Sequence, residues 1–79
     1  MLRVAEQIRH VVAEMLARGE IHDDVIASHV ITITQVRMST DLRLATAFVM
    51  PLGGKDTEKV IAALEKYRRY IRGRIAQTL

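Results

Sequence analysis

Two β-rich runs joined by a short turn decide the fold of this chain: Val30-Ile31-Thr32-Ile33-Thr34-Gln35-Val36-Arg37-Met38, then Ser39-Thr40-Asp41, then Leu42-Arg43-Leu44-Ala45-Thr46-Ala47-Phe48-Val49-Met50. β-Branched side chains favour extended backbone, which predicts a first strand from His29 to Met38. Serine, threonine and aspartate favour turns, and the run from Leu42 to Met50 is again strand-like. We therefore expect an antiparallel hairpin.

Alternation along the second strand leaves open which of its faces meets the rest of the protein. One face carries Leu42, Leu44, Thr46, Phe48 and Met50, and the other carries Arg43, Ala45, Ala47 and Val49. The small side chains of Ala45 and Ala47 suggest that a helix lies close on their side.

The segment before the hairpin has the spacing of an amphipathic helix, predicted from Leu2 to Arg18. Its apolar positions are Val4, Ile8, Val11, Val12, Met15 and Leu16. Gly19 is a suitable end for this helix because glycine tolerates a positive φ. The following residues, Glu20 to Ala27, are predicted to form a loop.

A second helical region follows the hairpin. Pro51, Gly53 and Gly54 break the strand, and Asp56 is a good N-cap for the helix. Apolar residues then keep helical spacing to the end of the chain, at Val60, Ile61, Leu64, Tyr67, Ile71, Ile75 and Leu79. We expect a bend or break in this region between Tyr67 and Gly73.

The composition fits one small α+β domain over residues 1–79, with 49% hydrophobic and 27% charged residues. Without cysteine there is no disulfide framework, thiolate metal site or cysteine nucleophile. Glu6 stands where a secretion signal would be apolar, and no long apolar run follows it. We therefore expect a cytoplasmic protein without a membrane span.

The excess positive charge lies in the last third of the chain. Residues 1–54 carry five basic and six acidic side chains, whereas residues 55–79 carry seven basic and three acidic ones. A basic segment of this kind points to an anionic partner, most often nucleic acid or a membrane surface. A solvated helix face without a partner is the alternative.

Several separated motifs carry a resemblance to a known family. They are Arg3-Val4-Ala5-Glu6-Gln7-Ile8-Arg9, Val30-Ile31-Thr32-Ile33-Thr34-Gln35-Val36 and Met38-Ser39-Thr40-Asp41-Leu42-Arg43-Leu44-Ala45-Thr46-Ala47-Phe48-Val49, followed by Val60-Ile61-Ala62-Ala63-Leu64 and Tyr70-Ile71-Arg72. In this order they resemble ribosome-binding factor A, a family of bacterial small-subunit assembly proteins. The resemblance implies a type II K-homology (KH) fold, α-β-β-α-α-β, which binds RNA along a helical junction.

The chain departs from the family pattern in two places. Family members continue with another strand after the position of Leu79, so we expect that a third strand is missing and that a sheet edge is exposed. The family also replaces the KH Gly-x-x-Gly loop by a helix-kink-helix around an Ala-x-Gly sequence, where this chain has Tyr67-Arg68-Arg69. Without that glycine, a kink and a nearly continuous helix both remain open.

The resemblance implies binding to the precursor of the small (30S) ribosomal subunit and its 16S rRNA, during late maturation and 5′-end processing, and a role in growth in the cold. Arginine pairs with phosphate and stacks on unpaired bases, so the basic residues are the candidate RNA contacts. They are Lys66, Arg68, Arg69, Arg72 and Arg74, supported by Arg43, with Arg3 and Arg9 contributing from the first helix. Tyr70 is the more exposed candidate for base stacking, whereas Tyr67 is expected in the core.

Other chemistries have less support in the sequence. His10, His22 and His29 lack the paired spacing of a zinc site, and we expect neither a metal nor a cofactor. Ser28 and His29 are expected to point to opposite faces of a strand, and we expect no enzyme. We expect a monomer that binds no membrane; a module that pairs through the hairpin edge and a membrane-surface module that uses the basic last helix remain alternatives.

Overall fold

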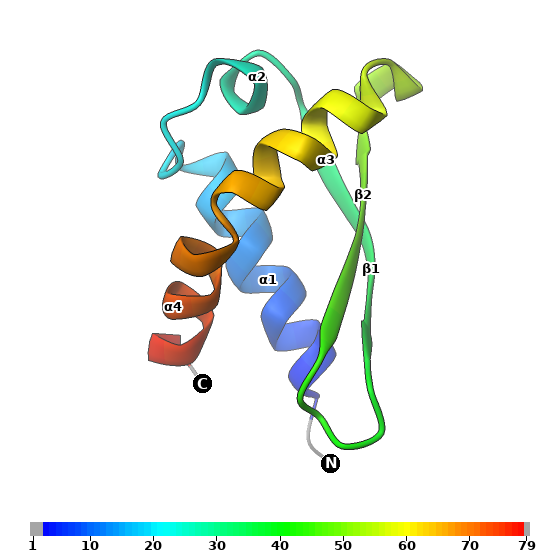
Figure 1. The fold of residues 1–79 in the computed structure, drawn as a ribbon, viewed down its shortest axis with the longest axis vertical. Helices are drawn as coiled ribbons and strands as arrows, with labels where there is room; N and C mark the ends of the chain where they lie inside the picture. The colour runs from blue at the N-terminus through cyan, green and yellow to red at the C-terminus, as the bar shows by residue number, and fades with distance from the viewer. Residues whose placement is uncertain (1–2, 79) are drawn as a thin grey trace.

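The computed structural model describes residues 3–78. Its elements follow the order α1 (Val4–Ala17), α2 (Asp24–Ala27), β1 (Ile31–Met38), β2 (Ala45–Pro51), the 3-10 turn η1 (Leu52–Gly54), α3 (Thr57–Lys66) and α4 (Arg68–Thr78). The strands form an antiparallel hairpin, and the helices lie on one side of it, with α1 beside β1 (Figure 1). The predicted α+β class is confirmed, and the element order is compatible with a type II KH-like arrangement.

A β-bulge at Thr34 aligns the inward side chains of β1. Ile33 and Gln35 occupy consecutive pairs with β2, so Thr34 has no residue opposite it. The Thr34 hydroxyl donates a hydrogen bond of 3.1 Å to the carbonyl oxygen of Phe48. Because the bulge shifts the alternation by one residue, Ile33 and Val36 both pack against the core.

The register also decides which face of β2 meets the helices. Val49 packs against the core, and Ala45 and Ala47 share its face, whereas Phe48 and Met50 are exposed on the opposite face. The inward face is therefore the alanine face, as predicted. The two alanines nevertheless remain exposed, because α1 lies beside β1, the other strand of the hairpin.

The core consists of two adjoining apolar clusters that join α1 to the remaining elements. Its buried members are Ile8, Val12, Met15, Ile21, Ile26, Ile33, Val60 and Ala63. Leu16 and Ile71 are partly buried and contact both clusters. This arrangement confirms the predicted apolar face of the first helix.

The apolar face predicted for the last helical region needs one correction. Ile61, one of the apolar residues with helical spacing, is 44% exposed and lies outside the core. The inward face of α3 follows Val60, Ala63 and Leu64, and Ile61 is turned away from it by the helical repeat. The prediction for Leu79 lies outside the described residues.

Three strand boundaries also differ from prediction, and the largest difference arises because the turn between the strands is longer. The Ser39 and Asp41 side chains accept hydrogen bonds from the backbone N–H groups of Leu44 and Arg43, at 3.0 and 3.1 Å. Leu42 has a φ of 60°, which interrupts extended backbone. The second strand therefore begins at Ala45 and not at Leu42. It ends at Pro51, which was predicted to break it, and the first strand begins at Ile31 and not at His29.

The segment predicted as a loop, Glu20 to Ala27, contains the one-turn helix α2. The Asp23 carboxylate caps it by accepting hydrogen bonds from the backbone N–H groups of Val25 and Ile26, at 2.9 and 3.2 Å. The turn buries Ile26 in the core. α1 ends as predicted, with Gly19 at a φ of 67°.

His29 connects the end of α2 to the start of α3. Its Nδ1 lies 2.7 Å from the carbonyl oxygen of Val25, and its Nε2 lies 3.1 Å from Oδ2 of Asp56. Donation to both acceptors raises the pKa of His29. Asp56 occupies the predicted N-cap position. Its side chain makes no capping hydrogen bond and pairs with His29 instead, so the predicted side-chain cap was wrong.

Candidate nucleic-acid interface

The last helical region breaks at Tyr67, between α3 and α4. Tyr67 has a φ of −105° and a ψ of 16°, which ends α3. Its ring packs against the core, and its hydroxyl donates to the carbonyl oxygen of His22 at 3.2 Å. The break therefore falls in the predicted region, and the alternative of a continuous helix was wrong. An anchored tyrosine stands at the break.

Four basic side chains flank this break, and we call them the basic junction: Lys66, Arg68, Arg69 and Arg72. All four are exposed. Arg68 pairs with Glu65 at 3.0 Å. Among residues 3–78, the other three members of the basic junction make no ion pair.

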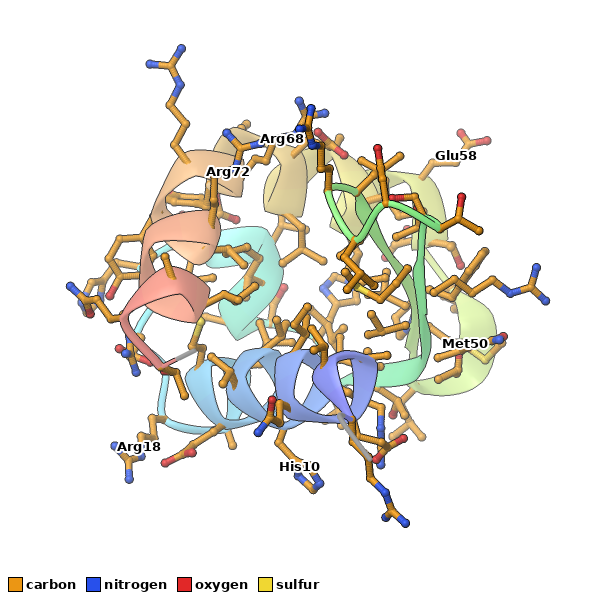
Figure 2. All side chains as sticks on the ribbon, turned by 90° about the horizontal axis from the view of Figure 1, so that it is seen from below. His10, Arg18, Met50, Glu58, Arg68 and Arg72 are labelled. Atoms are coloured by element: carbon orange, nitrogen blue, oxygen red, sulfur yellow. The ribbon has the colours of Figure 1, made fainter. Side chains whose placement is uncertain are left out.

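Two arginines of the basic junction point away from α1. Arg68 and Arg72, one helical turn apart, lie on the same side of the molecule, whereas Arg18 and His10 of α1 lie on the opposite side (Figure 2). At least these two arginines of the junction therefore present their charges on one side of the molecule.

The start of α4 adds backbone donors to these charges. The first N–H groups of a helix have no intrahelical partner, and they carry a partial positive charge. The first turn of α4 contains Arg68 and Arg69 and no acidic residue. Positive side chains at the positive end of the helix dipole destabilise the helix when no ligand is bound. A bound anion would interact favourably with both, so the junction suits a phosphate group.

Arg74, the fifth basic residue predicted in this region, pairs with an acidic side chain of another segment. Its guanidinium donates to both carboxylate oxygens of Glu20, at 2.9 and 3.3 Å, and the Tyr70 hydroxyl lies 3.4 Å from the same carboxylate. The hydrogen bond from Arg74 lowers the pKa of Glu20 and raises that of Arg74. Sequence reasoning missed Glu20 because this contact joins α4 to the loop after α1, far apart in the chain.

The remaining predicted contacts lie apart from the basic junction. Arg9 pairs with Glu6 on α1 at 2.8 Å. Arg3 lines a shallow hollow with Met38 and Leu42 beside the hairpin turn, and Arg43 belongs to that turn. The structure therefore gathers four of the eight predicted basic residues at one place and distributes Arg74, Arg9, Arg3 and Arg43 elsewhere.

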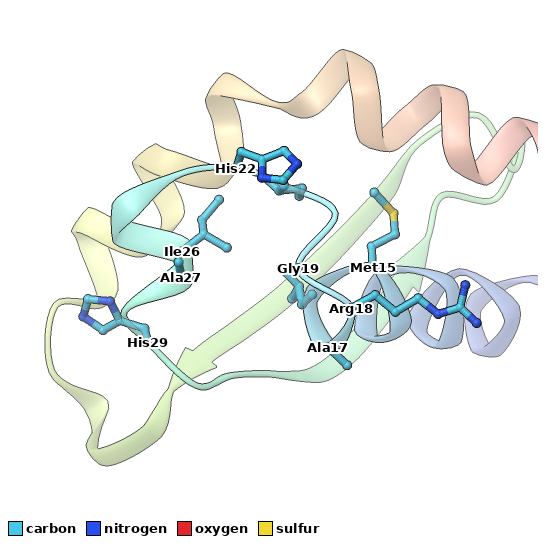
Figure 3. A pocket seen from close by; sticks show the side chains of 10 residues that line it. Met15, Ala17, Arg18, Gly19, His22, Ile26, Ala27 and His29 are labelled. Carbon is cyan, nitrogen blue, oxygen red and sulfur yellow. The ribbon is translucent and has the colours of Figure 1, made fainter.

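A hollow of about 380 Å³ opens where α1 ends and α2 begins (Figure 3). Arg18, at its rim, pairs with Glu14 at 2.7 Å, and His29, which also lines it, donates to Val25 and Asp56. In the part of the chain that the structure describes, no three His, Asp or Glu side chains gather as metal ligands. We assign no ligand to this hollow.

Ser28, His29 and Asp56 lie in contact, but they do not form a catalytic triad. The predicted opposite orientation of Ser28 and His29 was wrong: Ser28 Oγ lies 3.0 Å from His29 Nδ1, because Ser28 ends α2 and is not part of a strand. However, the Ser28 hydroxyl donates to the carbonyl oxygen of Val25, and His29 Nδ1 faces the same oxygen. A nitrogen that donates to this carbonyl is not a base for the serine.

A hairpin covered on one side by helices, with a basic helix break, defines a small KH-like α+β domain with a basic helical junction. The family model for ribosome-binding factor A matches residues 1–79. The chain belongs to the ribosome-binding factor A family.

Curated relatives agree with this assignment. The chain is 58% identical over 76 residues to ribosome-binding factor A of Rhodopseudomonas palustris (strain BisB5), 57% identical over 76 residues to that of Bradyrhizobium diazoefficiens, and 55% identical over 76 residues to that of Nitrobacter winogradskyi. These alignments cover 96% of this chain and 53 to 56% of the relatives, so the chain spans about half the length of the curated relatives it matches. No solved structure matches. Within residues 3–78, every helix is too short or too polar to cross a membrane.

Proposed function

We propose that this chain binds the precursor of the small (30S) ribosomal subunit and uses the basic junction to hold immature 16S rRNA in one conformation. The name of its relatives, ribosome-binding factor A, supports an association with ribosomes. The observation that carries the proposal is that Arg69 and Arg72 are exposed beside the N-terminus of α4 and make no ion pair with any residue from 3 to 78. The protein acts in the cytoplasm during late maturation and 5′-end processing, as a monomer and without turnover.

The packing of α4 explains how the junction would hold RNA. The Tyr67 hydroxyl and the Arg74–Glu20 pair both tie the last helical region to the loop after α1, so the backbone of α4 and its N-terminal N–H groups are oriented before RNA arrives. Arginine pairs with phosphate through two parallel N–H groups, and each phosphate contact releases counterions. Binding should therefore be tight at low salt and should weaken steeply as salt rises.

Sedimentation with ribosomal particles tests this function. The purified chain is spun with immature small subunits, with mature small subunits and with large subunits as the control, over a series of salt concentrations. We expect co-sedimentation that prefers immature small subunits and falls with salt. Equal binding to large subunits, or no binding at low salt by a chain that circular dichroism shows to be folded, would contradict the proposal.

The basic last helix also suggested a membrane surface as a partner, and the packing of α4 argues against it. Ile71 and Ile75, the apolar side chains of α4, pack against the core and leave no free apolar face for a bilayer. Vesicles containing anionic phospholipid provide the test, and we expect weak, salt-sensitive binding that is no stronger for this chain than for a peptide of equal charge.

A further inference from the structure

The hairpin has an outer face, turned away from the helices, that no other element covers within the described residues. We call it the outer sheet face, and all its side chains are exposed: Thr32, Gln35, Arg37, Thr46, Phe48 and Met50. Met50 lies on the side of the hairpin away from α4 (Figure 2). This face is therefore separate from the basic junction.

Phe48 lies near the middle of the outer sheet face, and it is the one phenylalanine of the chain. Its ring is not used in the core, since the side chain is 44% exposed. The guanidinium carbon of Arg37 lies 5.8 Å from the centre of the ring, within the range of a cation–π contact. Gln35 is the residue directly opposite Phe48 on β1.

The charge of the hairpin favours an anionic ligand. Between His29 and Lys55 the only carboxylate is that of Asp41 in the turn, where it accepts hydrogen bonds from Ser39 and Arg43. The outer sheet face itself carries one cation, Arg37, and no acidic side chain.

The mixture of side chains favours a nucleotide over an apolar protein surface. An apolar partner would desolvate Arg37, Gln35 and the threonines without hydrogen bonds in return. A nucleotide has a flat base for the ring of Phe48, base edges for the amide of Gln35, and a phosphate for the guanidinium of Arg37.

We propose that the outer sheet face binds an unpaired nucleotide of RNA, with its base stacked on Phe48 and its phosphate paired with Arg37. This inference rests on the proposed function, because the ligand in both is RNA. It adds a second contact surface, on the far side of the hairpin from the basic junction, and it assigns to this surface single-stranded RNA in particular.

The test is an NMR titration of the isotopically labelled chain with a short oligoadenylate at low salt. Backbone amide signals of residues 35–37 and 46–50 should shift and saturate. Phe48→Leu keeps an apolar side chain and removes the ring, and it should weaken binding at these residues roughly tenfold. Phe48→Tyr, the matched control, keeps the ring and should bind as the original chain does. Because Phe48 is exposed, both variants should fold, as circular dichroism can verify.

The outcomes separate this inference from the proposed function. Shifts confined to the α3–α4 region, with equal binding by Phe48→Leu, would overturn the outer-face site and leave the basic junction intact. No shifts at either surface, together with no co-sedimentation with small subunits, would overturn both proposals. Broadening of the outer-face signals with protein concentration alone, abolished by Phe48→Leu, would assign the face to a second copy of the chain and overturn the RNA site.

Discussion

The helices α1 and α4 use their charged residues in opposite ways. α1 buries Ile8, Val12 and Met15, and its arginines Arg9 and Arg18 pair with glutamates of the same helix. α4 buries no residue completely, and its first turn carries arginines without an acidic neighbour on the same helix. α1 therefore contributes mainly to the stability of the fold, whereas α4 contributes less to stability and presents an exposed cationic surface.

Truncation of a core-facing side chain in each helix should show the largest difference between them. Met15 is 0% exposed, so Met15→Ala should lower the free energy of unfolding by about 2 to 5 kcal/mol, through lost burial and a cavity. Ile75→Ala, at a partly buried site of α4, should cost less than about 2 kcal/mol. Urea denaturation followed by circular dichroism measures both, and equal losses would remove the distinction between the helices.

The anchoring of α4 by Tyr67 should have a smaller effect. Tyr67→Phe keeps the packed ring and removes the hydrogen bond to the carbonyl oxygen of His22. We expect a loss of about 0.5 to 1 kcal/mol in the free energy of unfolding, with faster amide hydrogen exchange at the start of α4. Unchanged exchange there would show that the hydroxyl does not hold the break. Tyr70→Phe, which removes a longer contact on the same helix, is the control.

The pair between Glu20 and Arg74 sharpens the comparison, because it ties α4 to the loop after α1, whereas the pair between Arg68 and Glu65 only joins α4 to the adjacent helix α3. Arg74 lowers the pKa of Glu20, so the pair stabilises the fold above the ordinary carboxyl pKa of 4.5 and loses this effect as the pH falls through the lowered value. Glu20→Gln should therefore be less stable than the original chain at neutral pH, and the difference should shrink below about pH 4.5.

The same substitution should act on RNA binding in the opposite direction. Glu20→Gln removes the carboxylate that neutralises Arg74, which should make the salt dependence of small-subunit binding slightly steeper. A difference in stability that persists at acid pH, or a shallower salt dependence, would contradict this account of Arg74.

The smallest expected effect concerns His29, which joins α2 to α3 and lies outside both compared helices. Its pKa is raised by donation to the carbonyl oxygen of Val25 and to Asp56, while Lys59 acts against this rise. The stabilisation is complete below the ordinary histidine pKa of 6.5 and is lost as the pH rises through the raised value. The advantage of the original chain over His29→Gln should therefore decrease as the pH rises above about 6.5. Urea denaturation at several pH values checks this, and a pH-independent difference would contradict it.

The hairpin and the apolar face of α1 could be predicted from the sequence because each depends on local periodicity. β-Branched runs and turn residues predict the strands, and helical spacing predicts Ile8, Val12 and Met15 as core residues. The one-turn helix α2 is too short to show a period, although the capping residue Asp23 was a signal for it. Leu42 with a positive φ could not be anticipated, because leucine rarely adopts that conformation.

The candidate site was predictable in composition but not in arrangement. The basic run was visible in the sequence, but the separation of Arg74 from Arg72 depends on Glu20, which is distant in the chain. Similarly, the contact of Arg37 with Phe48 depends on the register set by the bulge at Thr34. Tertiary contacts of this kind leave no periodic trace, so only the structure could separate the paired arginines from the unpaired ones.

The central claim is that unpaired arginines of α4, and not the paired arginines of α1, bind ribosomal RNA. The most direct test compares two variants that each lose two positive charges, Arg69→Gln/Arg72→Gln and Arg9→Gln/Arg18→Gln, in the salt dependence of binding to immature small subunits. We predict that the first variant binds more weakly and that its slope of log affinity against log salt is shallower by roughly one and a half. The second variant should match the original chain, and an equal loss in both variants would contradict the claim.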